Sequence, residues 1–312
     1  MPAAYVYSFK KFGGVPDLYT KPVNWLTIGD VLAEDIIIDH EVIFTAGTVI
    51  TLNKILKLQS LEIAYVKVSS TPFATANYQK QTIIFSDLIA QDFYNFLIKN
   101  NKNQRYSILL KDNEDFQFVT NHALLNMNES VVNLLSALKS WDNCSYKHVL
   151  DVFVIAAQWM RYLGMTVSAD DCYGLLLHDI GKIKVPRSIL IKNQSLTNEE
   201  YEYIKMHTEN GDCILKSLNF PNIVCDMAKF HHVRFNGTGY PKTYPEVLDI
   251  RIKMLMIVDV FSALTLDRPY RKAYSFEDGL DILKMEADGF DKDLLQQFIN
   301  FIKYKMEKIP QR

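Results

Sequence analysis

One stretch of this chain decides how its second half folds: Tyr173-Gly174-Leu175-Leu176-Leu177-His178-Asp179-Ile180-Gly181-Lys182. The apolar run before His178 is typical of a buried helix. At helical spacing His178 and Lys182 share one face, and Asp179 is also a neighbour of Lys182. Burying an imidazole, a carboxylate and an ammonium group together is costly unless they pair or bind a metal ion. The stretch alone leaves both interpretations open, a salt-bridged helix end and part of a metal site.

Other histidines occupy similar places around this stretch. His148 opens an apolar segment and His207 ends a predicted helix, while His231 and His232 close another. Asp259 interrupts a further apolar helix, where a lone carboxylate needs a partner. Taken singly, each of these fits a satisfied core or surface group. Together they match the nitrogen and oxygen ligands of two adjacent first-row metal ions, with one carboxylate able to bridge.

The loop after the double histidine is the second informative stretch: Val233-Arg234-Phe235-Asn236-Gly237-Thr238-Gly239-Tyr240-Pro241. With the His178–Lys182 motif upstream, it strongly resembles the HD-GYP family, a branch of the HD phosphohydrolases. The match continues around His207 and through the Asp259 helix into Asp267-Arg268-Pro269-Tyr270-Arg271. The resemblance implies a mainly α fold, with a C-terminal HD-type helical bundle and a small N-terminal α/β module.

The resemblance also implies an activity and assigns roles. It implies a cyclic di-GMP phosphodiesterase that opens the dinucleotide with a metal-activated hydroxide at a binuclear centre. Ligands of one metal are His148, His178, Asp179 and Asp259. Asp179 bridges to a second metal held by His207, His231 and His232. The catalytic residues are Lys182, which contacts the scissile phosphate, and Asp179. Substrate-binding positions are Arg268, Arg271, Gly239 and Tyr240.

The chemistry of phosphodiester hydrolysis agrees with these roles. Two metals roughly 3.5–4 Å apart acidify a water and clamp phosphate oxygens. Iron is the metal favoured by the resemblance, and manganese and zinc are alternatives because imidazole and carboxylate ligands suit all three. Lys182 and the two arginines add positive charge for an anionic substrate. For Arg268 and Arg271 the alternative is a solvated helix end or an ion pair with Asp267.

Several positions depart from the HD-GYP pattern. Val233, Asn236, Thr208 and Ser262 replace a common Glu, Asp, Pro and Asp. Cys144 stands where members with a third metal place a Glu, which disfavours a trinuclear site. The departures motivate a second hypothesis, a catalytically weak or inactive member that binds a cyclic dinucleotide or a partner protein for signalling. A third is an HD enzyme acting on another phosphorylated nucleotide, which the GYP loop disfavours.

Length, net charge and cysteine spacing limit the domain count, the partners and the compartment that the sequence predicts. The chain has 312 residues, which suggests about two domains, and 48% hydrophobic residues allow substantial cores. A net charge of −2 gives no support for binding DNA. The four cysteines lack metal-binding spacing and predict reduced thiols in the cytoplasm. No apolar run reaches the roughly 20 residues of a membrane span. Cyclic di-GMP, diguanylate cyclase domains and a second copy of the chain are the partners considered.

The pattern along the chain predicts three parts. Residues 1–80 form a small α/β regulatory or docking module, 81–140 a helical connector, and 141–312 the HD-GYP helical domain. Short β-like runs lie at residues 35–38, 42–44 and 64–68, with a helix near 52–61. Residues 69–82 are polar and predict a linker, while 83–100 and 118–139 have helical periodicity.

Two capping patterns mark the starts of catalytic-domain helices. Ser168 with Asp171 resembles a capping arrangement before the His178 helix. Thr197 with Glu200 does the same before His207. Because helices bring the ligands together from distant positions, we expect metal binding to be coupled to the fold.

Overall fold

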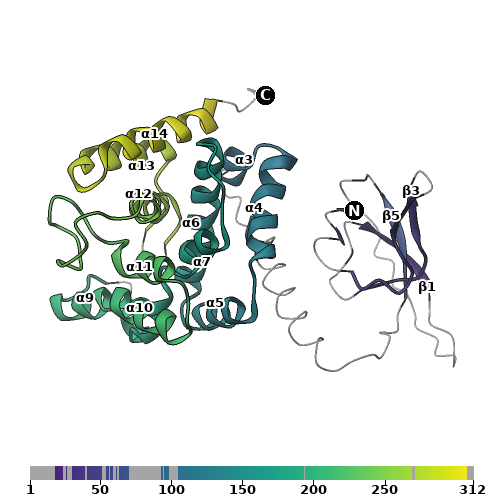
Figure 1. Ribbon diagram of the computed structural model, residues 1–312, viewed down its shortest axis with the longest axis horizontal. Coiled ribbons are helices and arrows are strands. Elements are labelled where there is room, and N and C mark those ends of the chain that lie inside the picture. The colour runs from purple at the N-terminus through teal and green to yellow at the C-terminus, as the bar shows by residue number, and fades with distance from the viewer. Residues whose placement is uncertain are drawn as a thin grey trace. The chain divides into compact units, whose positions relative to one another are not determined.

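The computed structural model of the chain divides into two compact units, Met1–Asp87 and Leu88–Arg312 (Figure 1). The structure describes residues 18–23, 26, 30–38, 41–50, 54–55, 57–58, 61, 63–69, 93, 95–97, 105–192, 194–268 and 271–307. The predicted linker over 69–82, except for Ser69, and Leu88 in the predicted helix over 83–100 lie outside the described residues. The second unit includes residues 88–140, which the sequence set apart as a connector.

The N-terminal unit is built on short antiparallel strands. Within its described part, β1 (Leu18–Pro22), β5 (Tyr65–Ser69) and β2 (Val31–Leu32) form a sheet in the order β1-β5-β2, and β3 (Ile36–Ile38) pairs with β4 (Glu41–Phe44). Burial alternates along β5, with Val66 and Val68 in the core. The three β-like runs predicted from the sequence are therefore confirmed. Of the predicted helix near 52–61, residues 54–55 and 57–58 are described and helical.

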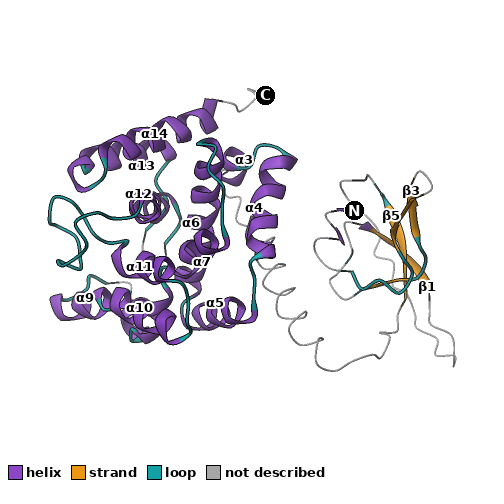
Figure 2. Cartoon of the chain, in the orientation of Figure 1, coloured by secondary structure: helices purple, strands orange, loops and turns teal. Residues whose placement is uncertain are grey.

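The second unit is mainly helical in its described residues, with loops between the helices (Figure 2). Its α-helices are α3 (Arg105–Leu109), α4 (Asn113–Leu125), α5 (Glu129–Trp141), α6 (Asn143–Tyr162), α7 (Ala169–Leu177), α8 (Arg187–Leu190), α9 (Asn198–Lys205), α10 (His207–Ser217), α11 (Asn222–Phe230), α12 (Ile250–Thr265), α13 (Phe276–Met285) and α14 (Lys292–Glu307). The described residues also include two 3₁₀ turns, η3 (Ile180–Lys184) and η4 (Ala287–Gly289), and helical residues at 93 and 95–97. The predicted mainly α fold is confirmed.

Helix α6 lies at the centre of this unit, packed against α5, α7 and α12. Buried apolar residues lie on nearly every side of α6, so other helices must cover it. Trp159 of α6 stacks edge-on against Phe298 of α14, with ring centroids 5.0 Å apart, and Phe298 in turn meets Phe261 of α12 at 5.1 Å. Burial of each such ring contributes about 1.5–3 kcal/mol, so one continuous core holds α6, α12 and α14 together.

The helix starts follow the capping patterns of the sequence. The Ser168 side chain accepts a hydrogen bond from the Asp171 amide, and the Asp171 carboxylate accepts from the Ser168 amide. Thr197 and Glu200 make the same reciprocal pair at the start of α9. Both predicted capping boxes are thus confirmed, and each satisfies backbone donors that a helix start leaves without partners.

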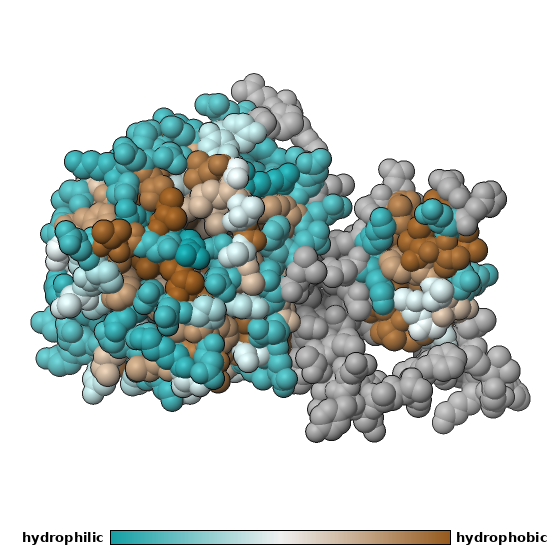
Figure 3. All heavy atoms as spheres, viewed as in Figure 1, coloured by the Kyte–Doolittle hydropathy of each residue, from teal (hydrophilic) through white to brown (hydrophobic). Residues whose placement is uncertain are grey.

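The face of the helical unit drawn in Figure 3 is mostly hydrophilic, with hydrophobic side chains gathered near its middle. Across the residues that the structure describes, no helix combines the length and the apolar character that crossing a bilayer requires.

Candidate metal centre

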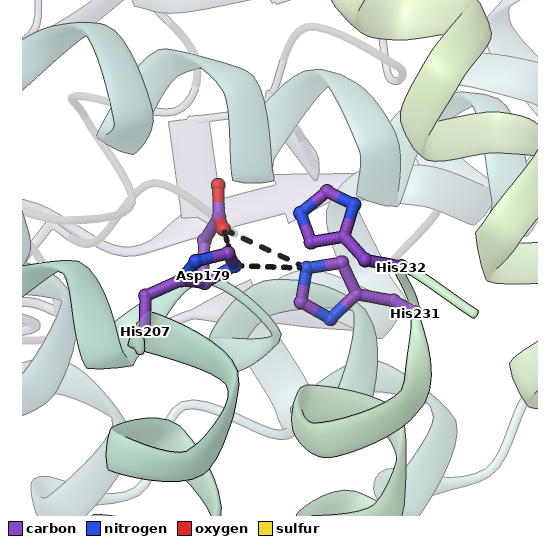
Figure 4. Close-up of side chains that lie close together, drawn as sticks. All are labelled: Asp179, His207, His231 and His232. Atoms are coloured by element: carbon purple, nitrogen blue, oxygen red, sulfur yellow. Dashed lines mark hydrogen bonds and ion pairs between the residues drawn. The ribbon is translucent and has the colours of Figure 1, made fainter. Parts of the chain in front are cut away.

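Seven side chains predicted as metal ligands converge inside the helical unit. Their helices meet there: α6 supplies one side chain, the C-terminal end of α7 two, the start of α10 one, the end of α11 two and the middle of α12 one. We call these residues the histidine–aspartate cluster: His148, His178, Asp179, His207, His231, His232 and Asp259. Figure 4 shows Asp179, His207, His231 and His232 gathered around a common space.

The cluster contains two groups with the spacing of metal ligands. In one, Asp179, His207, His231 and His232 each offer a ligand atom within 4.8 Å of the others. In the other, His148, His178 and Asp179 do the same. The structure therefore brings together all four residues that the sequence assigned to one metal and three of the four that it assigned to the other, with Asp179 in both groups.

The Asp179 carboxylate turns one oxygen to each group. Its Oδ1 lies 3.3 Å from His207 Nε2 and 3.8 Å from His231 Nε2. Its Oδ2 lies 3.8 Å from His178 Nε2 and 4.0 Å from His148 Nε2. Such a placement suits a carboxylate that bridges two ions.

Asp259 lies beside the group that contains His148 and His178 and reaches toward His232 of the other group. Its Oδ1 is 2.8 Å from His148 Nε2 and 3.8 Å from His178 Nε2. Its Oδ2 is 3.7 Å from His232 Nδ1. The carboxylate that interrupts the apolar helix α12 thus has imidazoles as its neighbours, as the sequence predicted.

Local backbone contacts orient three of the imidazoles. His178 Nδ1 donates to Leu175 O at 2.9 Å, and His207 Nδ1 to Ile204 O at 2.6 Å. His231 Nδ1 likewise donates to a carbonyl of its own helix, Ala228 O at 2.9 Å. Carbonyls only accept, so the proton of each neutral ring sits on Nδ1 and Nε2 carries a lone pair. Protein ligands of metals are held in this manner.

The Nε2 lone pairs of these imidazoles then face one another. This arrangement shows whether the residues are suited to hold a metal ion. His207 Nε2 and His231 Nε2 are 3.2 Å apart, and neither holds a proton to share. His178 Nε2 and Asp179 Oδ1 are buried without a hydrogen-bond partner among the described residues. Buried acceptors without donors are costly, and a cation between them removes that cost. The donor set fits divalent metal ions.

Burial keeps four imidazoles of the cluster neutral near pH 7. It lowers the pKa of His148 and of His207 to about 4 and that of His232 to about 3. Burial likewise brings the pKa of His231 well below its usual value. A neutral imidazole is the form that binds a metal.

The two carboxylates of the cluster are ionised. Burial raises the pKa of Asp179, but opposing causes, the nearby Lys182 ammonium first among them, outweigh this and hold the pKa well below its usual value. For Asp259, the His148 imidazole, 2.8 Å from Oδ1, and the neighbouring His232 outweigh burial and hold the pKa well below its usual value. The cluster thus presents lone pairs and two negative charges, the electrostatics that a pair of cations requires.

Glycines allow the close approaches around the cluster. A Cβ at Gly181 would collide with the backbone oxygen of His207, so only glycine lets η3 lie against α10. A Cβ at Gly239 would collide with the backbone oxygen of His232, where the Tyr240 amide donates at 2.9 Å. The Tyr240 ring then lies over His232, with centroids 4.7 Å apart. Gly239 and Tyr240 therefore support His232 from the loop side.

The predicted cationic residues lie in different settings. Lys182 Nζ donates to Asp179 Oδ2 at 2.6 Å, directly beside the cluster. Arg268 Nη1 lies 3.5 Å from Cys144 Sγ, and its charge acts on His148. Arg271 points elsewhere: its guanidinium donates to the carbonyls of Ala263 and Leu264 at the C-terminal end of α12, at 2.7 and 2.9 Å. The structure does not bring Arg271 to the cluster.

Comparison with known proteins identifies the family. The HD domain family profile matches residues 126–294, a span that contains the whole histidine–aspartate cluster. The chain belongs to the HD domain family. This confirms the family recognised in the sequence.

Curated relatives of this HD domain chain include enzymes of known name. A cyclic di-GMP phosphodiesterase of Pseudomonas aeruginosa is 31% identical over 172 residues, which is 54% of this chain and 42% of that protein. The 3'3'-cGAMP-specific phosphodiesterase 1 of Vibrio cholerae is 32% identical over 46% of this chain and 34% of its own length. A cyclic di-GMP phosphodiesterase of Thermotoga maritima is 29% identical over 57% and 51%. The matched regions span about a third to a half of these relatives.

The sequence missed a buried network behind this HD domain site. Arg105, which precedes the matched span, forms a two-pronged ion pair with Asp151 of α6 at 2.5 and 2.7 Å. Asp151 interrupts an apolar helix just as Asp259 does, so the same signal was present there. Its partner was not readable, because 46 residues separate Arg105 from Asp151.

Proposed function

We propose that this chain is a metal-dependent phosphodiesterase that hydrolyses a cyclic dinucleotide, cyclic di-GMP first among them. The observation that carries the proposal is the Asp179 carboxylate, with one oxygen facing His207 and the other facing His178. Membership of the HD domain family and the names of the relatives support the reaction class.

In this proposal each group of ligands holds one divalent ion. His148, His178, Asp179 and Asp259 hold the first. Asp179, His207, His231 and His232 hold the second. When bound, two such ions supply a nucleophilic water at neutral pH and positive charge for the phosphate oxygens. Iron is the metal proposed, and the ligand types suit manganese and zinc as well.

Cationic side chains beside the cluster suit an anionic substrate. Lys182 already reaches the cluster and is the group proposed to steady charge on the scissile phosphate. Beside the first ligand group, a cavity of about 420 Å³ is lined by Lys147, Arg187, Arg268 and Cys144, among other residues. Its size lies within the range of small-molecule sites, and its three cations, which outnumber the lining carboxylates of Asp142 and Asp267, suit a second phosphate.

The departures from the HD-GYP pattern leave the cluster intact. Val233 is fully buried in the core. Asn236 accepts from the Thr238 hydroxyl at 2.7 Å and donates to Asp288 at 3.1 Å, so it shapes the loop. The four cysteines are free thiols, which fits the reducing cytoplasm proposed for the chain.

The decisive test is turnover by protein loaded anaerobically with iron, and separately with manganese. Cyclic di-GMP and 3'3'-cGAMP are supplied in parallel, and products are separated by chromatography. We expect one P–O bond of cyclic di-GMP to be cleaved, giving the linear dinucleotide. Asp179→Asn should lose turnover and metal, while Asp281→Asn, at an exposed carboxylate on α13, should keep both. Binding of cyclic di-GMP without cleavage under any of these metals would overturn the enzyme proposal in favour of a binding protein.

A further inference from the structure

A line of buried hydrogen bonds leads from His148 away from the metal centre. His148 Nδ1 lies 3.0 Å from Ser262 Oγ of α12. The Ser262 hydroxyl in turn donates to Asp151 Oδ2 of α6 at 2.6 Å. All three residues are at most 1% exposed, so water does not compete for these bonds.

Helix α3 anchors the far end of this line. Arg105 donates to both Asp151 oxygens, and the Tyr106 hydroxyl donates to Asp151 Oδ1 at 2.7 Å. Arg105 Nη1 also donates to the backbone oxygen of Thr265 at 2.9 Å, which ties α3 to the end of α12. Both α3 residues precede residue 126, where the HD domain match begins. The anchor is therefore a feature of this chain's preceding segment.

The proton directions along the line follow from its members. Asp151 accepts from Arg105, Tyr106 and Ser262, and a carboxylate so surrounded by donors is ionised and has no proton to give. Ser262 must then donate its single proton to Asp151. Because this proton is already donated to Asp151, Ser262 Oγ accepts from His148. The His148 proton therefore sits on Nδ1. His148 Nε2 is left with its lone pair toward the metal centre, 2.8 Å from the acceptor Asp259 Oδ1, and a cation bound to both atoms would relieve this contact.

Position within a helix explains why His148 needs such a relay. His178, His207 and His231 lie at helix ends or starts and use a backbone carbonyl three residues earlier. His148 lies in the second turn of α6, where the preceding carbonyls are engaged by the helix itself. A side-chain acceptor from another helix is the available substitute.

We propose that Ser262 and Asp151 are positioning residues, held by Arg105 and Tyr106, that fix the ring and tautomer of His148 for a metal ion. The inference rests on the metal centre proposed above and deepens it. It also accounts for the departure at position 262: a carboxylate there would face the Asp151 carboxylate, whereas a hydroxyl can donate to it. Restoring the Asp that the HD-GYP pattern favours should therefore damage this site.

The first experiment observes the tautomer without any metal. Histidine-labelled apoprotein is measured by long-range ¹H–¹⁵N NMR, with His148 assigned through a His148→Asn variant. We expect a protonated Nδ1 and an unprotonated Nε2 in the wild-type protein and in Ser262→Thr, which keeps the hydroxyl. In Ser262→Ala the proton should move to Nε2, where Asp259 Oδ1 at 2.8 Å accepts it.

The second experiment measures metal binding by titration with Co²⁺, followed by its visible absorption. Ser262→Ala and Ser262→Asp should bind one of the two ions about 10- to 100-fold more weakly, the usual cost of removing an outer hydrogen-bond partner. Ser262→Thr should restore the affinity. Thr120→Val, which removes a buried hydroxyl on α4 that bonds only within its own helix, should leave both ions unaffected.

The outcomes separate this inference from the proposed function. An unchanged His148 spectrum in Ser262→Ala, or full affinity in Ser262→Asp, overturns the relay. If the wild-type protein binds no metal, the proposed function fails, and the imidazole spectra still decide whether Ser262 sets the tautomer.

Discussion

The helical unit contains two buried polar clusters, and they compensate their charged groups in opposite ways. In the lysine cluster, defined as Asp115, Gln158, Arg161 and Lys305, Lys305 donates to Asp115 at 2.7 Å and to Gln158 at 2.9 Å. Gln158 Nε2 donates to the backbone oxygen of Asp115 at 3.0 Å, and Arg161 Nη1 donates to the Asp115 carboxylate at 3.1 Å. In the histidine–aspartate cluster the lone pairs of His207 and His231 face each other across 3.2 Å.

The difference distinguishes a cluster that stabilises the fold from one that is suited to bind a metal. Burial of charge alone does not mark a site, because the lysine cluster buries charge and provides a donor for its acceptors. The feature that indicates a metal site is an excess of hydrogen-bond acceptors over donors, which only a cation from solution can satisfy. We therefore expect changes in the lysine cluster to affect folding, and changes in the histidine–aspartate cluster to affect metal binding.

The largest expected effect is on stability, in the lysine cluster. Lys305→Met keeps most of the apolar stem but leaves Asp115 buried with less positive charge beside it. Breaking a buried pair by removing one partner costs about 3–5 kcal/mol. Urea denaturation should show this loss, while the folded variant should bind metal in the wild-type ratio. Lys303→Met, at an exposed position on the same helix, is the matched control and should change stability little. A loss of metal in Lys305→Met would break the comparison.

The next effect falls on the metal centre. His231→Ala removes a ligand itself, so it should weaken binding of one ion at least about 100-fold, the upper end for outer partners. Turnover of cyclic di-GMP should fall with it. The apoprotein should lose little stability from the missing imidazole, because the lone pair that faced His207 is gone. His122→Ala, which removes an imidazole on α4 bonded to Phe118 O, should retain the metal. Equal metal loss in both variants would argue against a specific site.

The same contrast explains what the sequence could predict. The cluster was predictable because its residues stand in motifs that resemble the HD-GYP family, and because a carboxylate in an apolar helix, such as Asp259, indicates a partner. The Arg105–Asp151 pair was not, since it joins residues of different helices across the core. Arg271 shows a third limit: its pattern predicted a cation near the site, but side-chain direction depends on the packing at the end of α12, where it meets Ala263 O.

A third prediction concerns the stability of the apoprotein at acid pH. In the folded apoprotein the pKa of His148 and of His207 is about 4, whereas in the unfolded chain it is about 6.5. Between these values the unfolded chain binds more protons, so stability should fall as pH falls from 6.5 toward 4. The slope is roughly 1.4 kcal/mol per pH unit for each histidine.

Urea denaturation in a chelator, from pH 7 to pH 5, measures this slope. His207→Gln should reduce the slope, because one imidazole with a lowered pKa is gone. A slope unchanged by His207→Gln would show that the cluster does not hold its imidazoles neutral, and the comparison with the lysine cluster would lose its basis.

The smallest predicted effect tests whether the histidine–aspartate cluster depends on its helices or on tertiary packing. Ser168→Ala removes the N-cap of α7, the helix that ends at His178, and should cost about 1 kcal/mol. The cap lies at the opposite end of α7 from His178, whose ring is oriented by Leu175 O. Metal affinity of the folded variant should therefore equal that of the wild-type protein, and Ser168→Asp, which retains a capping oxygen, should recover the stability. A weakened metal site in Ser168→Ala would mean that α7 transmits its fraying to the ligands, and that the cluster is less firmly held than its burial implies.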